Sequence, residues 1–432
     1  MCPGIKTLSR KRQAACGLAQ RRQIAPTSAP KRIRTMNARP FYYTWNHQPA
    51  ADLFLVDRAE QDEFVLQDGR RVYDFISTSF QANFGHNHPV IREAIHRQLD
   101  VMPIASPKAS FELKQRVSAR LNELIGLAGG KVFYTVSGSE SVENALKMAR
   151  QMTGRTKILA RKKSYHGASL GALSVTGDWR NEPHFTLDEH TVRIPEPSDD
   201  PLLETTRQII SCTGADHIAA CIIETISGTN GVAIPSREWF KGIVALCREH
   251  DILLIMDEIL CGFGRTAPSF AFQEYQLQPD FVCLSKGITG GYIPFGAVWT
   301  GPRVVEYYDS EKMSCGLTAY AHPLGLAALE GVLDLMSDPA FQENKMAIEH
   351  LFGQTMREIR AWPLVSEVRC RGLLAAIDLL DRSAPNWQTM LDGGLHAFSN
   401  ENTVILSPPL ISTPARLAEA LDVLKRLLHE SA

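Results

Sequence analysis

The sequence predicts an α/β fold built around a largely parallel sheet, and two patterns support this expectation. From about Phe41 onward, short runs of apolar and β-branched residues alternate with stretches in which apolar residues recur at helical spacing. Several of the short runs are apolar on both faces, which is typical of strands covered by helices on both sides. A chain of 432 residues, of which 44% are hydrophobic, is also long enough to bury a large core and to form two domains.

Five of the short runs are expected to be strands of this sheet. In chain order they are KVFYTV (131–136), KILAR (157–161), AACIIET (219–225), ILLIMDE (252–258) and FVCLS (281–285). Helices are expected between them, for example over EWFKGIVALCREH (238–250), whose apolar residues recur at helical spacing. From roughly Gly331 the chain becomes helix-rich and then gives two further apolar runs, LLAAIDLL and TVILSPPLIS, so we expect a smaller second domain there.

The overall charge and the cysteine pattern argue against several kinds of protein. The formal net charge is -1, which gives no bulk attraction to nucleic acid or to an anionic membrane. No apolar stretch approaches the roughly 20 residues that are needed to span a bilayer. The nine cysteines are scattered singly without a C-x-x-C pair, which argues against a zinc site or a disulfide framework and favours reduced thiols in a cytosol-like compartment.

The amino terminus differs in composition from the rest of the chain. No Asp or Glu occurs before residue 52, while Lys and Arg crowd the first 35 residues. This composition resembles an organelle transit peptide, but a disordered basic tail or a translated leader upstream of a start at Met36 are the preferred interpretations. No hydrophobic core of a signal peptide is present, which disfavours secretion. We therefore expect residues 1–35 to lie outside the mature fold of a cytoplasmic protein, with organellar import as the alternative.

The residues that follow each predicted strand are candidates for a ligand site, because ligands of open parallel sheets bind at the carboxyl ends of the strands. Ser137, Gly138 and Ser139 follow the first run and lead into an amphipathic helix. A small, glycine-containing turn at a helix N-terminus offers free backbone N–H groups and the positive end of the helix dipole, which suits a phosphate group. An ordinary helix cap is the alternative interpretation.

Three other strand ends carry an aromatic residue, a carboxylate and a lysine. Tyr165 and His166 follow the second run, where an aromatic ring could stack on a planar cofactor or fill a gap in the packing. Asp257 ends the fourth run, and a buried carboxylate needs a partner such as a protonated ring nitrogen. Lys286 follows the fifth run and precedes glycines. Together with the anion-binding turn, these are the groups that pyridoxal 5'-phosphate requires, with the lysine forming the Schiff base.

Longer motifs around these residues resemble those of the class III (ω-amino acid) aminotransferases of fold type I. The resemblance runs from Thr44 to Ser412, and within the family the chain looks most like taurine–pyruvate aminotransferases. The matching segments are FGHNHP (84–89), SGSESVENALKMAR (137–150), SYHG (164–167), GTNGV (228–232), DEILCGFGRT (257–266), SKGITGGYIPFGAV (285–298) and GLTAYAHPLG (316–325).

The resemblance implies a particular domain organisation. A large cofactor-binding domain with a mostly parallel seven-stranded sheet would span residues 91–330. A smaller α+β domain would be built from both ends of the chain, from residues 36–90 and 331–432. The family also implies a homodimer in which the two subunits share their active sites.

The resemblance also implies roles for individual residues. Lys286 would be the Schiff-base lysine and proton shuttle, and Asp257 would pair with the pyridine nitrogen of the cofactor. The other expected cofactor contacts are Ser137, Gly138 and Ser139 at the phosphate, Tyr165 and Ile259 on the two ring faces, His166, Glu224 near Asp257, and Thr318 from the neighbouring subunit. The implied reaction is a ping-pong transfer of an amino group from an amine to a keto acid.

The expected substrate follows from departures from the family pattern. Members that act on glutamate or ornithine place an arginine before the PPL motif and a glutamate in the GTNG region, where this chain has Ile405 and Thr229. The site of a mobile arginine in many ω-transaminases is Phe398. Because an arginine fork is the natural clamp for a carboxylate, these losses favour pyruvate over 2-oxoglutarate as acceptor. The resemblance to taurine–pyruvate aminotransferases implies a taurine- or β-alanine-like donor. The candidate pocket walls are Tyr43, Trp45, Phe80 and Phe398.

Three alternatives accompany this interpretation. The same cofactor chemistry supports elimination, decarboxylation or racemisation, and release of free ammonia without a keto acid would favour elimination. A non-catalytic transaminase fold is disfavoured, because both Lys286 and Asp257 are present. His86 and His88 are spaced like a metal pair, but with no third ligand in view no metal is expected.

Overall fold

The computed structural model describes residues 40–48, 54–184, 188–380 and 384–430. The expected leader at residues 1–35 lies outside this described part of the chain. Contacts divide the chain into two compact units, residues 1–53 and residues 54–432. In the first unit, a short turn is closed by the Gln48 side chain, which accepts a hydrogen bond from the Tyr43 N–H (2.9 Å) and donates one to the Tyr43 carbonyl (2.7 Å).

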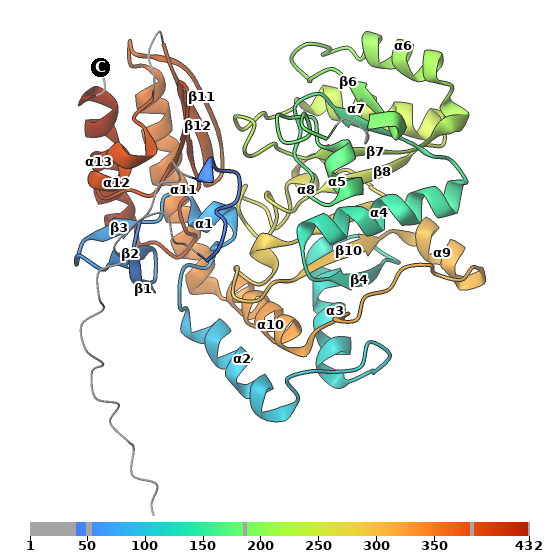
Figure 1. Ribbon diagram of the computed structural model, residues 1–432, viewed down its shortest axis with the longest axis horizontal. Helices are drawn as coiled ribbons and strands as arrows, with labels where there is room; N and C mark the ends of the chain where they lie inside the picture. Colours follow the sequence, from blue (N-terminus) through green and yellow to red (C-terminus); the bar gives the residue numbers. More distant parts are fainter. Residues whose placement is uncertain (1–39, 49–53, 185–187, 381–383, 431–432) are drawn as a thin grey trace, which may run out of the picture. The chain divides into compact units, whose positions relative to one another are not determined.

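The second unit is built on a seven-stranded sheet (Figure 1). In spatial order its strands are β4 (Lys131–Thr135), β10 (Gly296–Thr300), β9 (Phe281–Leu284), β8 (Leu253–Asp257), β7 (Ile218–Glu224), β5 (Lys157–Arg161) and β6 (Thr191–Ile194). Strand β10 is antiparallel to both of its neighbours, and the pairs from β9 to β6 are all parallel. The prediction of an α/β fold with a mostly parallel sheet is confirmed, and all five predicted strands belong to this sheet.

Helices cover both faces of the sheet. The helices between residues 89 and 337 are α2 (Pro89–Val101), α3 (Glu112–Ile125), α4 (Gly138–Thr153), α5 (Leu170–Val175), α6 (Glu204–Thr213), α7 (Arg237–Glu249), α8 (Ala271–Glu274), α9 (Pro302–Ser310) and α10 (Pro323–Ser337). Successive side chains of a strand point to opposite faces. Accordingly, Ile222 and Ile255 of the central strands pack in one cluster with helix α4, while Ile223 and Met256 pack in another cluster with α7.

Helix α7 confirms the helix predicted over residues 238–250. It begins where the Ser236 hydroxyl accepts a hydrogen bond from the Trp239 N–H (3.1 Å), and it buries Trp239, Phe240 and Ile243 against the sheet. A serine at this position satisfies a helix N–H that has no acceptor within the helix. Of the residues that the structure describes, no helix is both long enough and apolar enough to cross a bilayer.

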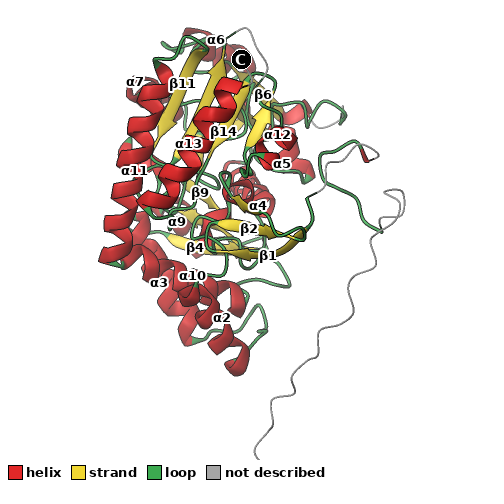
Figure 2. Ribbon diagram, turned by 90° about the vertical axis from the view of Figure 1, so that its left-hand side faces the viewer, coloured by secondary structure: helices red, strands yellow, loops and turns green. Residues whose placement is uncertain are grey.

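Two smaller antiparallel sheets come from the two ends of the second unit. One contains β1 (Val56–Glu60), β2 (Glu63–Leu66) and β3 (Arg71–Tyr73), and the other has the order β11 (Val365–Arg371), β12 (Leu374–Leu379), β14 (Thr403–Leu406) and β13 (Phe398–Asn400). Helices α11 (Pro339–Arg360) and α13 (Pro414–Glu430) lie beside the four-stranded sheet (Figure 2), and α1 (Ser77–Phe80) and α12 (Trp387–Asp392) complete the elements. The runs LLAAIDLL and TVILSPPLIS form β12 and β14.

A buried carboxylate joins the two chain ends. Asp74, just after β3, receives hydrogen bonds from His86 Nε2 and His396 Nδ1, both at 3.0 Å. Burial alone would raise the pKa of Asp74, but the two histidines outweigh burial and lower it. The Tyr73 carbonyl also accepts a hydrogen bond from the His396 N–H (2.8 Å). These contacts explain why segments more than 300 residues apart lie together.

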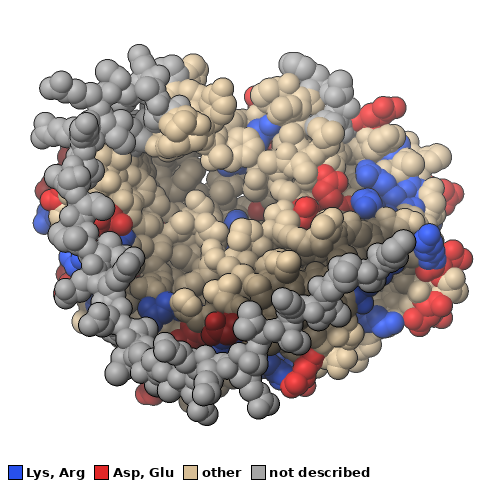
Figure 3. All heavy atoms as spheres, turned by 60° about the horizontal axis from the view of Figure 1, so that its bottom comes forward, with Lys and Arg blue, Asp and Glu red and all other residues tan. Residues whose placement is uncertain are grey.

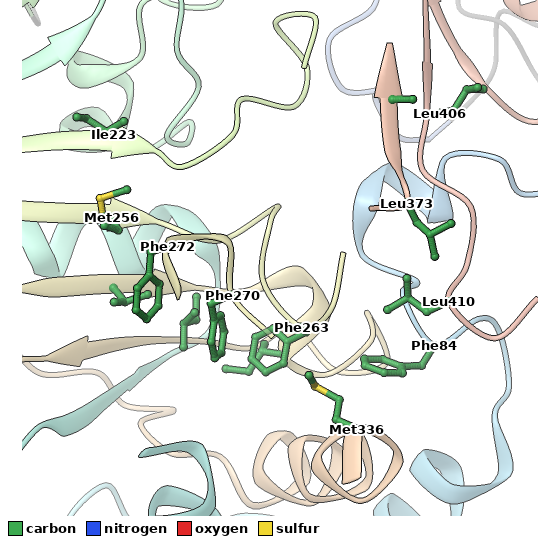
Figure 4. Packing of buried hydrophobic residues seen from close by; sticks show 14 of the residues in the cluster. Phe84, Ile223, Met256, Phe263, Phe270, Phe272, Met336, Leu373, Leu406 and Leu410 are labelled. Carbon is green, nitrogen blue, oxygen red and sulfur yellow. The ribbon is translucent and has the colours of Figure 1, made fainter. Parts of the chain in front are cut away.

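The core is continuous between the large sheet and the chain ends. Figure 4 shows a series of buried side chains that runs from Ile223 and Met256 on the large sheet through Phe272, Phe270 and Phe263 to Phe84 and Leu410. The rings of Phe263 and Phe270 have centroids 5.2 Å apart at an interplanar angle of 74°. Edge-to-face pairs of this kind add to the stabilisation that apolar burial provides.

Candidate active site

The carboxyl ends of the central strands surround a cavity. Its walls come from the turn before α4, from the segment after β5, and from the ends of β7, β8 and β9. The lining residues are Ser137, Gly138, Ser139, Tyr165, His166, Gly167, Glu224, Ile226, Thr229, Asp257, Ile259, Leu260, Ser285 and Lys286. The structure therefore brings together every cofactor contact expected within one subunit.

One end of the cavity is suited to an anion. The Ser137 hydroxyl caps helix α4 by accepting a hydrogen bond from the Glu140 N–H (3.2 Å). The N–H groups of the first turn at Gly138 and Ser139 have no acceptor within the helix, and they lie at the positive end of its dipole. A methyl group on Gly138 would stand 3.0 Å from Ile259, so glycine keeps this end open.

A glycine with a positive φ angle supports this anion site. Gly167 has φ +136°, and a Cβ atom there would lie 2.4 Å from Ser139 Oγ and 2.9 Å from Ser139 Cα. The same Ser139 hydroxyl accepts a hydrogen bond from the Ala168 N–H (3.0 Å). Residue 167 must therefore be glycine for the backbone to approach the helix N-terminus this closely.

A carboxylate and an imidazole form the polar centre of the cavity. Asp257 Oδ2 lies 2.7 Å from His166 Nδ1, and Asp257 Oδ1 accepts a hydrogen bond from the Ile259 N–H (3.0 Å). Both side chains are buried. Within the described residues, His166 Nε2 and Thr229 Oγ1 have no hydrogen-bond partner. Because buried polar atoms are normally paired, these two atoms indicate a cavity that a polar ligand fills.

A second buried ion pair supports the wall on the β5 side. The Arg161 guanidinium, which is fully buried, contacts Glu196 at 3.0 Å and Glu224 at 3.3 Å. Burial raises the pKa of Glu224, although Arg161 opposes this effect. Glu224 Oε1 also accepts a hydrogen bond from the Tyr165 N–H (3.2 Å). This network fixes the backbone that carries Tyr165.

Lys286 begins the 3-10 turn η4 (Lys286–Ile288) directly after β9. Desolvation by the surrounding protein lowers the pKa of its ammonium group, and the nearby carboxylates of Asp257 and Glu224 oppose that shift. A lower pKa increases the fraction of neutral amine, which is the nucleophilic form. Lys286 Nζ also lies 5.2 Å from the ring centroid of Phe80.

Phe80 is presented by an unusual turn. Four consecutive residues without glycine, Ser77 to Phe80, have φ angles of 44°, 46°, 62° and 68°. The left-handed region is unfavourable for such residues. The buried Arg265 side chain holds this turn by donating to Ser77 Oγ (3.1 Å) and to Asn83 Oδ1 (2.8 Å).

The remaining predicted site residues lie outside the cavity lining. Phe398, on β13, packs against a buried cluster that contains Phe80 and Leu260. Thr318 is exposed. Tyr43 and Trp45 belong to the first unit, whereas all the residues that line the cavity belong to the second. In the described residues, no group of three or more His, Cys, Asp or Glu side chains could hold a metal ion.

Several residues of the site escaped prediction from the sequence. Gly167, Ile226, Leu260 and Ser285 line the cavity, but their types are common in any packed core. Arg161 had a detectable signal, because an arginine at the end of an otherwise apolar run must find a carboxylate if it is buried. Its partners could not be identified, since Glu196 and Glu224 are 35 and 63 residues away along the chain.

Comparisons with known proteins agree with this geometry. The family model described as "Aminotransferase class-III" matches residues 43–428. An omega-aminotransferase of Caulobacter vibrioides is 31% identical over 400 residues, covering 84% of this chain and 90% of the relative. An omega-amino acid–pyruvate aminotransferase of Pseudomonas putida is 28% identical over 427 residues, covering 90% and 94%. Among solved structures, taurine:2-oxoglutarate aminotransferase from Bifidobacterium kashiwanohense, in complex with PLP and glutamate, has a TM-score of 0.85 at 30% identity and covers 90% of this chain and 95% of its own.

Proposed function

The chain belongs to the class III aminotransferases, which are pyridoxal 5'-phosphate-dependent enzymes, and on this premise we propose its reaction and substrates. The proposed enzyme moves the amino group of an amine or ω-amino acid, such as taurine or β-alanine, to a small keto acid, with pyruvate as the preferred acceptor. The observation that carries this proposal is that Lys286, Asp257 and the N-terminus of α4 line the same cavity.

The residues present fit the cofactor. The backbone N–H groups of Gly138 and Ser139 would hold its phosphate, and Tyr165 and Ile259 would cover the two faces of its ring. Asp257 would pair with the ring nitrogen. When bound, the cofactor supplies an aldehyde that condenses with amines and a cationic ring that accepts the electron pair released when a substrate C–H bond breaks.

Side chains of the cavity and its surroundings have separate roles in the proposed reaction. Lys286 would supply the amine that attaches the cofactor, and when a substrate amine takes its place, the Lys286 amine would take up the proton from the substrate carbon. Its lowered pKa favours the neutral form that accepts a proton. Asp257 keeps its negative charge directed into the cavity because His166 and the Ile259 N–H fix both of its oxygens. Glu224 and Arg161 keep the backbone of Tyr165 in place.

Two observations support the proposed substrates. The arginines that clamp carboxylates in other members are replaced by Ile405 and Phe398, and the glutamate of the GTNG region is replaced by Thr229, which disfavours 2-oxoglutarate as acceptor. Among the similar proteins, the enzyme from Pseudomonas putida is named for pyruvate as acceptor, and the enzyme from Bifidobacterium kashiwanohense is named for taurine as donor, with 2-oxoglutarate as its acceptor.

We also propose that the protein works in the cytoplasm as a homodimer with shared active sites. Val101, the last residue of α2, and Ile104, which follows the helix, are 79% and 74% exposed, which is unusual for large apolar side chains of a monomer. Uncharged residues occupy most of the middle of the face in Figure 3, as is typical of subunit interfaces. The seven cysteines that the structure describes are unbridged, which fits a reducing compartment.

Subunit mixing tests the sharing of sites. Light scattering should give a mass of twice the chain. Thr318→Val and Lys286→Ala variants should each lose activity, and a mixture refolded together should recover part of it, because one site of the mixed dimer then contains both native residues. No recovery, or a monomer in solution, would contradict the shared site.

The visible spectrum of the purified protein tests the reaction itself. Taurine, β-alanine, γ-aminobutyrate, alanine and diamines are added one at a time without an acceptor. We expect the absorption band of the Lys286-bound cofactor to be bleached by at least one of them, to return when pyruvate is added, and to be missing in Lys286→Ala. Release of free ammonia without pyruvate would instead indicate elimination, and no band after loading with the cofactor would refute the assignment.

A further inference from the structure

A second cavity lies outside the active site, between helix α11 and the end of strand β11. Its lining residues come from these two elements, from Gly372 and from Ala267, and it shares none of them with the active-site cavity. Its volume is about 530 Å³, compared with about 170 Å³ for the active-site cavity. Cavities that bind small molecules measure about 300 to 1,000 Å³, so this α11–β11 cavity is large enough for a ligand.

Three arginines line the α11–β11 cavity. Arg357 and Arg360 lie in the last turn of α11, and Arg371 is the last residue of β11. All three act on the thiol of Cys370, which also lines the cavity: burial raises the pKa of this thiol to about 11, and the three positive charges oppose that shift. Because electrostatic interactions weaken with distance, this common effect indicates that the three guanidinium groups converge on one place.

These arginines have few acidic partners. Within the described residues, neither Arg357 nor Arg360 forms an ion pair, and Arg360 donates a hydrogen bond to the Val368 carbonyl. Both arginines are exposed, so a ligand can reach them from the solvent. Arg371 donates to Glu274 Oε1 (2.7 Å), while its buried Nε atom has no hydrogen-bond partner in the part of the chain that the structure describes.

The helix dipole explains only part of this arrangement. Cations are favourable in the last turn of a helix, which accounts for Arg357 and Arg360 taken singly. It does not account for the third arginine, which comes from a strand, or for its unpaired Nε atom, because buried polar atoms are normally paired. The acidic lining residue Glu349 already pairs with the Lys345 ammonium at 2.6 Å, so the cavity keeps an excess of positive charge.

The other walls of the cavity are apolar. Met356 and Val368 are buried at its inner side, and Met346 is 60% exposed beside the arginines. Methionine side chains adapt to the shape of an apolar or aromatic group. An arginine fork matches the oxygens of a phosphate, and a doubly charged group suits a site with two arginines that have no acidic partner.

We propose that the α11–β11 cavity is a binding site for a phosphate ester of a compact apolar or aromatic molecule. Arg357, Arg360 and Arg371 bind the phosphate group, and Met346 covers the apolar body of the ligand. The site is separate from the cofactor site, and it does not depend on which amine or keto acid the enzyme uses.

Calorimetry on the holoenzyme tests the proposal, because the bound cofactor then occupies the phosphate site of the active-site cavity. Phenyl phosphate is the probe, inorganic phosphate represents its charged group alone, and benzyl alcohol represents its body alone. We expect phenyl phosphate to bind once per chain and at least about tenfold more tightly than either part. No binding of phenyl phosphate would overturn the proposal, and equal binding of inorganic phosphate would show a site for the free ion instead of an ester.

Variants of Arg357 locate the binding in this cavity. Arg357→Met should weaken phenyl phosphate by about 10- to 100-fold, the loss expected for one hydrogen-bonded charge pair, and Arg357→Lys should recover part of it. Arg207→Met, which changes an exposed arginine of α6, is the matched control and should leave the affinity unchanged. If Arg357→Met binds phenyl phosphate as tightly as the wild type does, the ligand lies elsewhere and the proposal is wrong.

A variant of Met346 tests the apolar wall. Met346→Ser removes the apolar contact and keeps the arginines, so it should weaken phenyl phosphate by about three- to tenfold and leave inorganic phosphate unchanged. Equal losses for both probes, or no loss for either, would show that Met346 does not cover the body of the ligand.

Discussion

Glu258 makes the stability of this enzyme depend on pH in a way that can be calculated from the structure. Its carboxylate is fully buried and accepts hydrogen bonds from Thr225 Oγ1 (2.6 Å), the Phe272 N–H (2.7 Å) and the Ala271 N–H (2.9 Å). Burial nevertheless raises the pKa of Glu258 from an ordinary 4.5 to about 7, even though these three hydrogen bonds oppose the shift.

Because the pKa is higher in the folded protein than in the unfolded chain, the folded state is favoured while Glu258 is protonated. This contribution is complete below pH 4.5 and is lost as the pH rises through about 7. At about 1.4 kcal/mol for each pH unit, the full difference is about 3 kcal/mol, of which about 2.5 kcal/mol falls between about pH 5 and about pH 8.

The assay compares the wild-type protein with Glu258→Gln, whose side chain does not titrate. Midpoints of thermal unfolding are measured for both holoenzymes from about pH 5 to about pH 8. For a chain of this length, the wild type should lose about 3 °C relative to Glu258→Gln over that range. A difference between the two midpoints that stays constant with pH would refute the reasoning.

Three further predictions concern residues that support the active site. Gly167→Ala places a methyl group against the backbone and hydroxyl of Ser139, so it should destabilise the protein by about 2 to 5 kcal/mol and release the cofactor on dialysis; an unchanged melting midpoint would contradict this. Arg265→Met leaves four buried acceptors without their donor, so denaturant titration should show a loss of at least about 4 kcal/mol; a loss below about 1 kcal/mol would mean that other groups replace the guanidinium. His166→Phe removes the hydrogen bond to Asp257 and should lower the rate of the amine half-reaction about 10- to 100-fold, with His166→Asn recovering part of it; equal rates in the two variants would count against the orienting role.

Much of the large sheet was predictable because its central strands carry a strong local signal. Strands β7, β8 and β9 are buried on both faces, so almost every residue in them is apolar. Strands β6 and β10 were not predicted. Strand β6 is a short strand at the edge of the sheet, and it contains a charged residue, Arg193, which donates hydrogen bonds to nearby carbonyl groups. Strand β10 follows a segment rich in glycine and proline, a composition that is typical of a loop. Short edge strands have no pattern that distinguishes them from loops.

The sequence by itself determined which chemical groups stand at the strand ends: the small turn before α4, Tyr165, Asp257 and Lys286. The carboxyl ends of parallel strands all lie at the edge of the sheet where ligands bind, whatever the details of side-chain packing. The local sequence is therefore sufficient to predict which residues face the ligand. Only the tertiary structure decided that His166 binds Asp257, that Arg161 joins Glu196 to Glu224, and that Arg180 lies on Tyr165. Except for the last, these contacts join residues that are far apart along the chain, and all of them depend on how strands and loops pack, which residue types and spacing do not encode locally.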